Sequence, residues 1–455
     1  MPSSPPRHPP VRPATSPLPT PAGGYRLGGP EYRRISVALF AAGLATFALL
    51  YSTQPLLPAL ARDFHLSAGQ SALSVSLCTV GLGLALLVAG PVSEVLGRTV
   101  LIHASLWSSA VVALLCAVAP SWPVLLGLRT LLGITLAGLP AVAVAYLREE
   151  VHEDSHAKAT GLYIGGTALG GMAGRLVAGG LADLGGWRLA LGGIGALALV
   201  CAGLARWLLP ASRRFVAAPP RPRDLLATTG RLVREPALLA LYGIAATMMG
   251  AFVAVYNVMG FRLAAAPYAL SLGLSGLVFC VYPLGSLSSA YAGRLADRHG
   301  RRVVVPVACA VTAVGVVVTL ARPLPVVVLG LAVMTVGFFA AHGVASGWVA
   351  TLAHLGVGGT GQAASLYLFA YYLGSSVFGG VAGTAWGAGG WNPVVLLSLV
   401  LVLAGLGLSL ALRRMPSLLE PAARSGSADT SPAAPGHPTD PPGLHGPDRR
   451  GPEAA

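Results

Sequence analysis

The chain has 455 residues, of which 54% are hydrophobic, with 30 basic and 16 acidic residues and a mean hydropathy of +0.71. A soluble protein carries about a quarter charged residues, so this composition argues against a soluble enzyme. The stretch from Pro323 to Leu412 contains no Asp, Glu, Lys or Arg, which fits lipid surroundings. The net charge of +14 does not indicate nucleic acid, because the basic residues lie between apolar segments and form no patch on a soluble module.

The two ends of the chain differ in composition from the rest. Residues 1–30 and 416–455 contain 19 of the 36 prolines, mixed with Ser, Thr and Gly. Such segments bury too little apolar surface to offset the entropy lost on ordering. We therefore predict a disordered tail over residues 1–32 and a second one over residues 415–455.

The interval between the tails divides into twelve apolar segments, each long enough to span a bilayer at about 20 residues. The predicted spans are 36–58, 71–92, 99–119, 123–146, 158–181, 188–209, 237–260, 270–291, 303–321, 324–350, 360–385 and 391–412. An arginine-rich linker, 210–236, separates a bundle over 33–209 from a bundle over 237–414. The predicted fold class is an all-α integral membrane protein with two six-helix bundles.

The basic residues predict the orientation of these spans. When they are assigned to alternate sides, 24 of the 30 fall on the side that holds both tails and the linker. Short cytoplasmic loops carry the excess of Lys and Arg in membrane proteins. We expect both termini and the linker to be cytoplasmic.

The two predicted bundles repeat each other at an offset of 203 to 204 residues. Gly90, Glu94, Gly97 and Arg98 match Gly293, Asp297, Gly300 and Arg301, and Gly185-Gly186-Trp187 matches Gly389-Gly390-Trp391. A parallel six-plus-six repeat is the architecture of transporters that rock two halves around a midplane site. The repeat favours transport before any family is considered.

The repeated block resembles the cytoplasmic signature of the major facilitator superfamily, in which a Gly is followed by an acid and then by Gly-Arg. Both copies, 90–99 and 293–302, fall where the family has them. The first copy departs from the family in having Glu94 for the usual Asp and no second basic residue after Arg98. The resemblance implies a breakable latch that holds the outward-facing state, formed by Gly90, Glu94, Gly97, Arg98, Gly293, Asp297, Gly300 and Arg301. The alternative is that these charges only shape tight turns.

Two arginines fall inside predicted spans, where a cation costs about 2.5–3.5 kcal/mol on insertion scales. Arg129, followed four residues later by Gly133, resembles a helix-4 element that is linked in the family to proton transfer; the alternative is that it extends to the outer surface. Arg175 follows Gly161, Gly170 and Gly174, which resemble the antiporter motif of twelve-helix drug–proton antiporters, at a place where that family has Pro. Arg175 could bind an anionic substrate group or a helix C-terminus, or it could pack against backbone carbonyls.

The wider resemblance covers residues 33–414 and points to bacterial exporters of drugs or sugars. It is carried by Tyr51-Ser-Thr-Gln54-Pro55, Tyr256-Asn257 and the tyrosines near Tyr371. It implies a multi-pass protein of the bacterial inner membrane that acts as a monomer. It implies a proton gradient as the energy source and no cofactor.

Titratable side chains are scarce at mid-membrane in the predicted spans. No acidic residue lies near the middle of one, so His342 is the candidate for reversible protonation, because imidazole has an unperturbed pKa near 6.5; a structural, hydrogen-bonded His342 is the alternative. The charge-relay candidates are thus Arg129, Arg175 and His342. The candidate substrate cavity comprises neutral amides and phenols, which favour a neutral or weakly charged solute: Tyr51, Gln54, Tyr256, Asn257, Gln362 and Tyr371.

Several functions compete for this sequence. The leading hypothesis is a secondary transporter that exports small organic molecules by alternating access with proton antiport. An ion-independent facilitator or uptake carrier is the alternative, and a non-transporting receptor is less favoured. An enzyme is not expected, because no catalytic cluster, metal-ligand spacing or Gly-x4-Gly-Lys-Ser/Thr loop is present.

Overall fold

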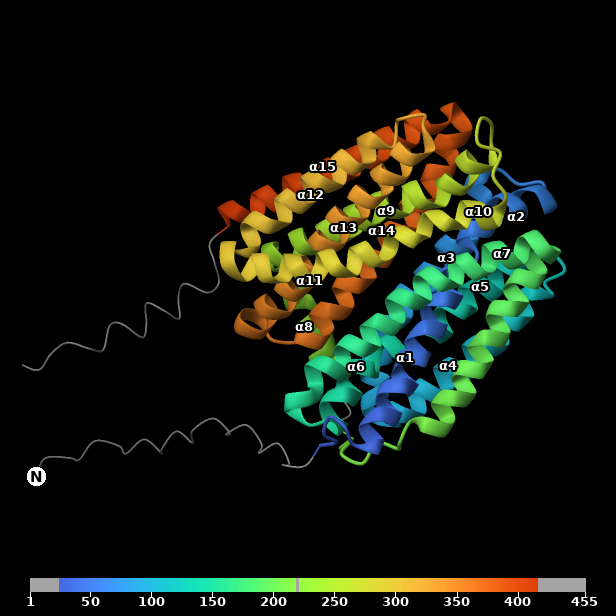
Figure 1. Ribbon diagram of the computed structural model, residues 1–455. Coiled ribbons are helices and arrows are strands. Elements are labelled where there is room, and N and C mark those ends of the chain that lie inside the picture. Colours follow the sequence, from blue (N-terminus) through green and yellow to red (C-terminus); the bar gives the residue numbers. More distant parts are fainter. Residues whose placement is uncertain (1–23, 218–220, 416–455) are drawn as a thin grey trace, which may run out of the picture. The chain divides into compact units, whose positions relative to one another are not determined.

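The computed structural model describes residues 24–217 and 221–415 (Figure 1). The first half contains α1 (Pro30–Tyr51), η1 (Gln54–Leu56), α2 (Leu57–Asp63), α3 (Ala68–Leu96), α4 (Arg98–Ala117), α5 (Trp122–Leu136), α6 (Gly138–Glu150) and α7 (Glu153–Leu208). The second half contains α8 (Pro222–Leu232), α9 (Pro236–Ala264), α10 (Leu272–Gly276), η2 (Leu277–Val281), α11 (Tyr282–His299), α12 (Arg301–Val318), α13 (Leu324–Leu352), η3 (Ala353–Val357), α14 (Thr360–Gly389) and α15 (Trp391–Arg414). The described ranges hold one isolated β-bridge, between Tyr25 and Val151, and no longer strand.

The helices cross a membrane twelve times. Eleven helical segments of the described chain are long and apolar enough to span, and one of them, α7, has 56 residues. At 1.5 Å per residue α7 would be about 84 Å long, far more than the ~30 Å hydrocarbon core. The chain reverses within it at Gly185 and Gly186, so α7 supplies two crossings. The all-α, twelve-helix prediction is confirmed, and Figure 1 shows α1–α7 and α9–α15 gathered in two groups.

Glycines in the left-handed region mark equivalent turns of the two repeats. Gly97 (φ 90°) and Gly300 (φ 84°) each precede the arginine that begins the next helix. Gly186 (φ 77°) and Gly390 (φ 70°) each precede a tryptophan. A side chain with a Cβ rarely adopts this conformation, which explains why both copies of the repeat need glycine at these places.

Glycines also allow the long helices of each bundle to approach closely. A Cβ at Gly170 of α7 would lie 2.2 Å from the carbonyl oxygen of Leu44 in α1. Its repeat equivalent in α14, Gly374, has the carbonyl oxygen of Ala246 of α9 at 2.0 Å from the same position. Small residues are what membrane helices use for such contacts. Two glycines of the antiporter-like motif, Gly170 and Gly174, therefore have a packing role in this chain, whereas Gly161 has none.

The structure differs from the predicted tail and linker in two respects. Residues 24–28 were expected to belong to a disordered tail, but Tyr25 exchanges backbone hydrogen bonds with Glu150 and His152 at the α6–α7 turn. The linker contains the short helix α8, which contacts α14 and η3. The remaining tail residues, 1–23 and 416–455, lie outside the described part of the chain.

The two ends of the bundles differ in what they carry. The distal end, as we name it, carries α2, α10 and the Gly185–Gly186 turn. The linker end carries α8, the turns at Gly97 and Gly300, and residues 24–28. The described acidic side chains all lie at one of these ends or in the linker.

The close contact at Gly170 predicts a site-specific cost of a methyl group. Replacing Gly170 with Ala should destabilise the protein by about 1–3 kcal/mol through overpacking. Gly161→Ala, in the same helix, is the matched control, because no heavy atom of the described chain lies within 4 Å of its Cβ position. Thermal unfolding of the purified variants should lower Tm for Gly170→Ala alone; equal Tm values would contradict the packing role.

Candidate functional site between the bundles

The distal end is closed by two equivalent contacts between the bundles. A Cβ at Gly383 of α14 would lie 2.5 Å from the Cα of Gly69 in α3. A Cβ at Gly179 of α7, its repeat equivalent, would lie 2.8 Å from the carbonyl oxygen of Leu272 in α10. The start of a helix from one bundle thus rests on a glycine of the other bundle, twice. These contacts leave no space for a solute to pass between the paired helices.

Asp183 reinforces one of these contacts. Its carboxylate, on α7, accepts hydrogen bonds from the Ser271 hydroxyl (2.6 Å) and from the backbone N–H groups of Leu272 (3.0 Å) and Gly273 (2.9 Å). All three donors belong to the other bundle. A carboxylate at a helix N-terminus also interacts favourably with the helix dipole. The repeat supplies no equivalent, since Gly387 stands at the matching position of α14.

A hydrogen bond at the pseudo-symmetry axis joins Gln54 to Asn257. The Gln54 side-chain nitrogen donates to Asn257 Oδ1 at 2.8 Å, and both residues are buried. They are 203 residues apart, so they occupy the same place in the two repeats. The Gln54 oxygen in turn accepts from Nε of Arg175 at 2.6 Å. Two predicted cavity residues and a predicted charge-relay residue therefore form one chain of contacts.

Arg175 lies in a cage of aromatic rings from both bundles. Its guanidinium carbon is 4.2 Å from the ring centre of Tyr51, 4.8 Å from Phe279 and 4.6 Å from Tyr282. A second hydrogen bond runs to the carbonyl oxygen of Gly171, and the residue is 2% exposed. No carboxylate pairs with it in the described ranges. The charge is held by ring faces and two hydrogen bonds.

Arg129 has a different environment. Its three guanidinium nitrogens donate to the carbonyl oxygens of Leu49 (3.1 Å), Leu50 (2.8 Å) and Ser74 (2.9 Å). Leu49 and Leu50 are in the last turn of α1, where carbonyls lack helical partners and a cation is favoured. Arg129 is fully buried, so the alternative in which it extends to the outer surface is wrong.

The rings around Arg175 continue into a larger aromatic cluster that reaches His342. Consecutive ring centres of this cluster lie 4.1–6.0 Å apart along Phe279, Tyr256, Phe252, Phe338, His342 and Tyr371. His342 Nδ1 is 3.0 Å from the Tyr367 hydroxyl. The Tyr256 hydroxyl contacts Thr335 at 2.8 Å. The structure thus places His342 beside the predicted residue Tyr371, while Phe252 and Phe338 lie between it and Tyr256.

Gln362 does not belong to this cluster. The expectation that it lies deep in a span is wrong, because it is in the first turn of α14 at the linker end. Its side chain donates to the Leu225 carbonyl (3.1 Å) and lies 3.4 Å from the Thr229 hydroxyl, both in α8. Gln362 therefore attaches the linker helix to the second bundle.

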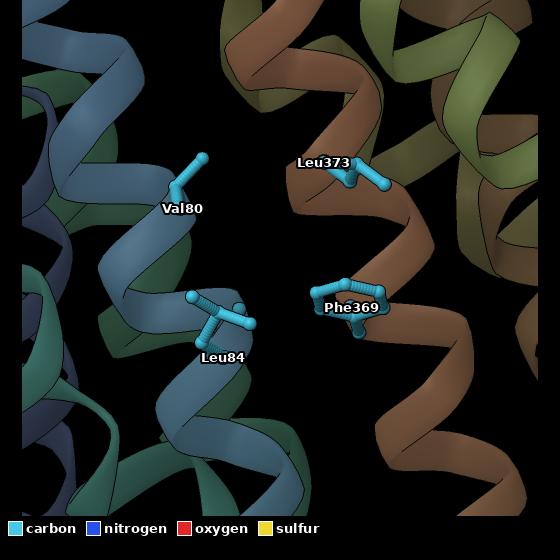
Figure 2. A pocket seen from close by; sticks show the side chains of 5 residues that line it. Val80, Leu84, Phe369 and Leu373 are labelled. Carbon is cyan, nitrogen blue, oxygen red and sulfur yellow. The ribbon is translucent and has the colours of Figure 1, made fainter.

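A small apolar pocket lies between α3 and α14 (Figure 2). It has a volume of about 160 Å³ and is lined by Val80, Gly83, Leu84, Phe369 and Leu373. The sequence gives no sign of this pocket, because its residues are ordinary apolar positions of two distant helices. Its lining offers no charged or polar side chain.

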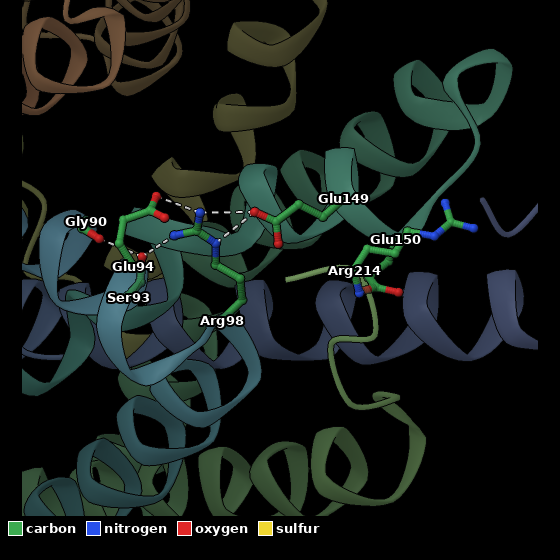
Figure 3. A network of polar contacts seen from close by, with 7 residues as sticks. All are labelled: Gly90, Ser93, Glu94, Arg98, Glu149, Glu150 and Arg214. Atoms are coloured by element: carbon green, nitrogen blue, oxygen red, sulfur yellow. Dashed lines mark hydrogen bonds and ion pairs between the residues drawn. The ribbon is translucent and has the colours of Figure 1, made fainter. Parts of the chain in front are cut away.

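At the linker end, the first copy of the repeated block forms an ion-pair network (Figure 3). Arg98 donates to Glu94 at 2.6 Å and to Glu149 at 3.0 Å, and it also contacts the Ser93 hydroxyl. The neighbouring Glu150 accepts from the backbone N–H groups of Arg213 (2.7 Å) and Arg214 (3.0 Å). The acids at the end of α6 were not singled out in the sequence, since they follow no motif.

The second copy is not paired in the same way. Asp297 is exposed, and the described chain has no ion pair for Asp297 or Arg301. Leu352 and Ala353 stand where the repeat would place counterparts of Glu149 and Glu150. A Cβ at Gly90 or Gly293 would meet no described atom within 4 Å, so these two glycines mediate no close helix approach in this conformation.

Two further features bear on chemistry. The described residues contain no group of three or more His, Cys, Asp or Glu side chains that could hold a metal ion.

Four phenol oxygens near the cluster have no hydrogen-bond partner in the described chain: those of Tyr51, Tyr282, Tyr371 and Tyr372. The phenol oxygen of Tyr242 also has no partner, but it is fully enclosed by protein, whereas these four are not. Tyr51 and Tyr282 lie beside Arg175, Tyr371 lies beside His342, and Tyr372 packs against Tyr371, so these phenols could bind a solute.

The bonds of Asp183 predict that this residue holds the distal end closed. Asp183→Asn should favour separation of the bundles there by about 1 kcal/mol, or about fivefold in population, because an amide offers a single, uncharged acceptor to donors that now meet two oxygens. Distances between spin labels at the exposed positions Leu184 and Leu274 report this change. Asp63→Asn is the control, since Asp63 bonds to Trp187 and Arg188 within its own bundle. Equal distance distributions in the two variants would rule out the role.

Known proteins are similar to this chain in sequence and in fold. The sequence profile of the Major Facilitator Superfamily matches residues 39–290. An uncharacterized MFS-type transporter of Bacillus subtilis, YybF, is 39% identical over 388 residues, which cover 84% of this chain and 94% of that protein. The inner membrane transport protein YnfM of Escherichia coli is 40% identical over 378 residues, covering 83% and 90%.

Solved structures share the fold at low sequence identity. A bacterial homologue of the human lysosomal transporter Spinster, in an inward-facing and unoccupied conformation, has a TM-score of 0.69 at 15% identity and covers 85% of this chain and 98% of its own. A point mutant of the nucleoside transporter NupG has a TM-score of 0.67 at 14% identity, covering 83% and 99%. The major facilitator fold is therefore confirmed. Together with the sequence matches, it shows that the chain belongs to the Major Facilitator Superfamily and is a multi-pass membrane transporter.

Proposed function

We propose that this transporter exports small organic molecules by alternating access, coupled to proton antiport. The observation that supports this proposal is the reciprocal closure of the distal end, where each bundle rests a helix start on a glycine of the other. Two equivalent bundles that meet through matched surfaces can rock against each other around a site at their interface. The Gln54–Asn257 bond joins the bundles across that interface and would part when the distal end opens.

The latch belongs to the same proposal. In it, the linker end is cytoplasmic, and the turns at Gly97 and Gly300 approach the opposite bundle when the linker end closes. Arg98, held by Glu94 and Glu149, keeps the first turn rigid. The exposed Asp297 and the half-buried Arg301 stay free to form contacts in the other state. The protein acts in a bacterial inner membrane as a monomer, with both termini cytoplasmic.

His342 is the proposed proton carrier. It lies mid-way along α13, against Tyr367 and Tyr371, and neutral imidazole takes up a proton near neutral pH in water. The described acids lie at the helix ends, so no carboxylate competes for this role at mid-membrane. The second candidate is a facilitator that needs no ion. The absence of described carboxylates at mid-membrane favours it if the role of His342 is only a structural hydrogen bond.

Reconstitution distinguishes the two candidates. The proteoliposomes contain a pH-sensitive fluorophore and carry an imposed pH gradient. Adding a transported dye, sugar or organic acid should change the pH of their lumen, because each solute molecule is exchanged for a proton. His342→Gln should abolish the proton movement, because glutamine does not titrate. His103→Gln, which changes an imidazole in α4 outside the aromatic cluster, is the control.

Each result has a defined meaning. Solute flux without proton movement in the wild-type protein would favour the facilitator. Proton movement that persists unchanged in His342→Gln would remove this residue from the coupling.

A further inference from the structure

We propose that Arg175 binds the anionic group of the transported solute, and that this solute is a small aromatic or amphipathic carboxylate. The proposal rests on the proposed transport function, since it places the site at the boundary between the moving bundles. It adds a substrate class and a residue that recognises it. The observations that carry it are the uncompensated charge of Arg175, its unused hydrogen-bond donors and the origin of its cage.

The charge of Arg175 is not neutralised by the protein. The nearest acid along α7, Asp183, is eight residues away, about 12 Å along the helix axis, and its carboxylate is already bonded to α10. Arginine stays charged in proteins. An intramembrane cation that neither a counter-ion nor backbone carbonyls fully satisfy marks a substrate or ion pathway. The missing partner is an anion from outside the chain.

Two other buried arginines, Arg129 and Arg262, show what a structural role looks like in this protein. Arg129 uses each guanidinium nitrogen on a backbone carbonyl. Arg262 donates to the carbonyls of Thr319 and Ala321 at the distal end of α12 and stacks on Trp391. Arg175 has a single carbonyl partner and a single side-chain partner, which leaves three of its five N–H groups without an acceptor in the described chain. These three donors can bind a carboxylate, with the planar fork geometry that suits it.

The surroundings of Arg175 fit an aromatic or amphipathic anion. The neighbouring rings offer faces for stacking, and the phenols of Tyr51, Tyr282, Tyr371 and Tyr372 are unpartnered among the described residues. A second cation, Arg129, lies in the same bundle without a counter-charge. The interior is therefore net positive, which disfavours cationic solutes.

The cage gives the site a dependence on conformation. Phe279 and Tyr282 belong to the second bundle, whereas Arg175, Tyr51 and Gln54 belong to the first. Opening of the distal end would withdraw two of the three rings and the Asn257 bond that orients Gln54. The exposed guanidinium then gains more from an anion than it does in the closed state. Anion binding and distal opening therefore favour each other, so a solute that enters from the linker end would promote the opening through which it leaves.

Equilibrium binding of labelled benzoate to the full chain in nanodiscs tests this site. Benzamide is the neutral isostere and should not compete, because it lacks the charge. Arg175→Gln should weaken benzoate binding by at least about tenfold, the equivalent of about 1.4 kcal/mol. Arg188→Gln, which changes an exposed arginine stacked on Trp187 at the same end, should leave it unchanged.

A second variant separates ligand recognition from a structural role. Phe279→Leu removes a ring that competes with the anion, so it should strengthen benzoate binding by about fivefold, within the range of a desolvated cation–π contact. A purely structural Arg175 would give no gain. Because Phe279→Leu keeps the arginine, this measurement remains decisive even if Arg175→Gln does not fold.

Any of four results would overturn the proposal: no benzoate binding to the wild-type protein, competition by benzamide, unchanged affinity in folded Arg175→Gln, or no gain in Phe279→Leu. The proposed function fails separately. If benzoate binds but proteoliposomes show no solute flux, the anion site stands and the proposed export fails. If a neutral solute is transported but benzoate does not bind, the transport function stands and the anion site fails.

Discussion

The hydrogen bond between Gln54 and Asn257 joins the two bundles at the centre of their interface. It joins the same position of the two repeats, so it lies at the axis that relates them. Gln54 reaches that axis because α1 ends at Tyr51 and the chain continues as the short turn η1. Pro55 and Pro58 lack the N–H groups that a continuous helix would need there. The break after α1 directs the Gln54 side chain toward the second bundle.

The same break explains the two buried cations. In lipid every backbone polar group must find a partner within the protein. The carbonyls of Leu49 and Leu50, in the last turn of α1, are bound by Arg129. Arg175, one helix away, instead orients Gln54 and faces rings of both bundles. A structural cation and a cation available for function thus differ in how many carbonyls the local backbone offers them.

Much of the fold could be predicted because lipid imposes simple rules on composition. The twelve spans follow from uninterrupted apolar runs, and the repeat is visible because the turns at Gly97, Gly186, Gly300 and Gly390 need a positive φ that glycine provides. The site was harder to predict. The contact of Gln362 with α8 could not be predicted, because α8 is short and polar and has no apolar run that would reveal it in the sequence. The closing role of Asp183 depends on α10, which is 88 residues away.

The repeated sequence block also does not predict that the two halves differ in their ion pairs. The second copy of the repeated block matches the family better, yet the first copy forms the ion pairs, since Glu149 and Glu150 end α6 and have no acidic counterpart in the second half. The motif specifies a turn. Its electrostatic partners come from whichever neighbouring helix ends nearby.

A reversible disulfide across the distal end tests the central claim most directly. Cysteines at Gly69 and Thr384 would join α3 to α14 between the bundles, where the Cβ position of Gly69 is 2.9 Å from the Thr384 hydroxyl. Cysteines at Gly43 and Thr167 would join α1 to α7 within one bundle, where the Cβ position of Gly43 is 3.0 Å from the methyl carbon of Thr167. With Cys280, the exposed native cysteine, replaced by serine, oxidation should stop solute flux in proteoliposomes for the first pair, and a reductant should restore it, whereas the second pair should transport throughout. Undiminished flux through the protein locked between Gly69 and Thr384 would contradict a mechanism in which the bundles part at this end.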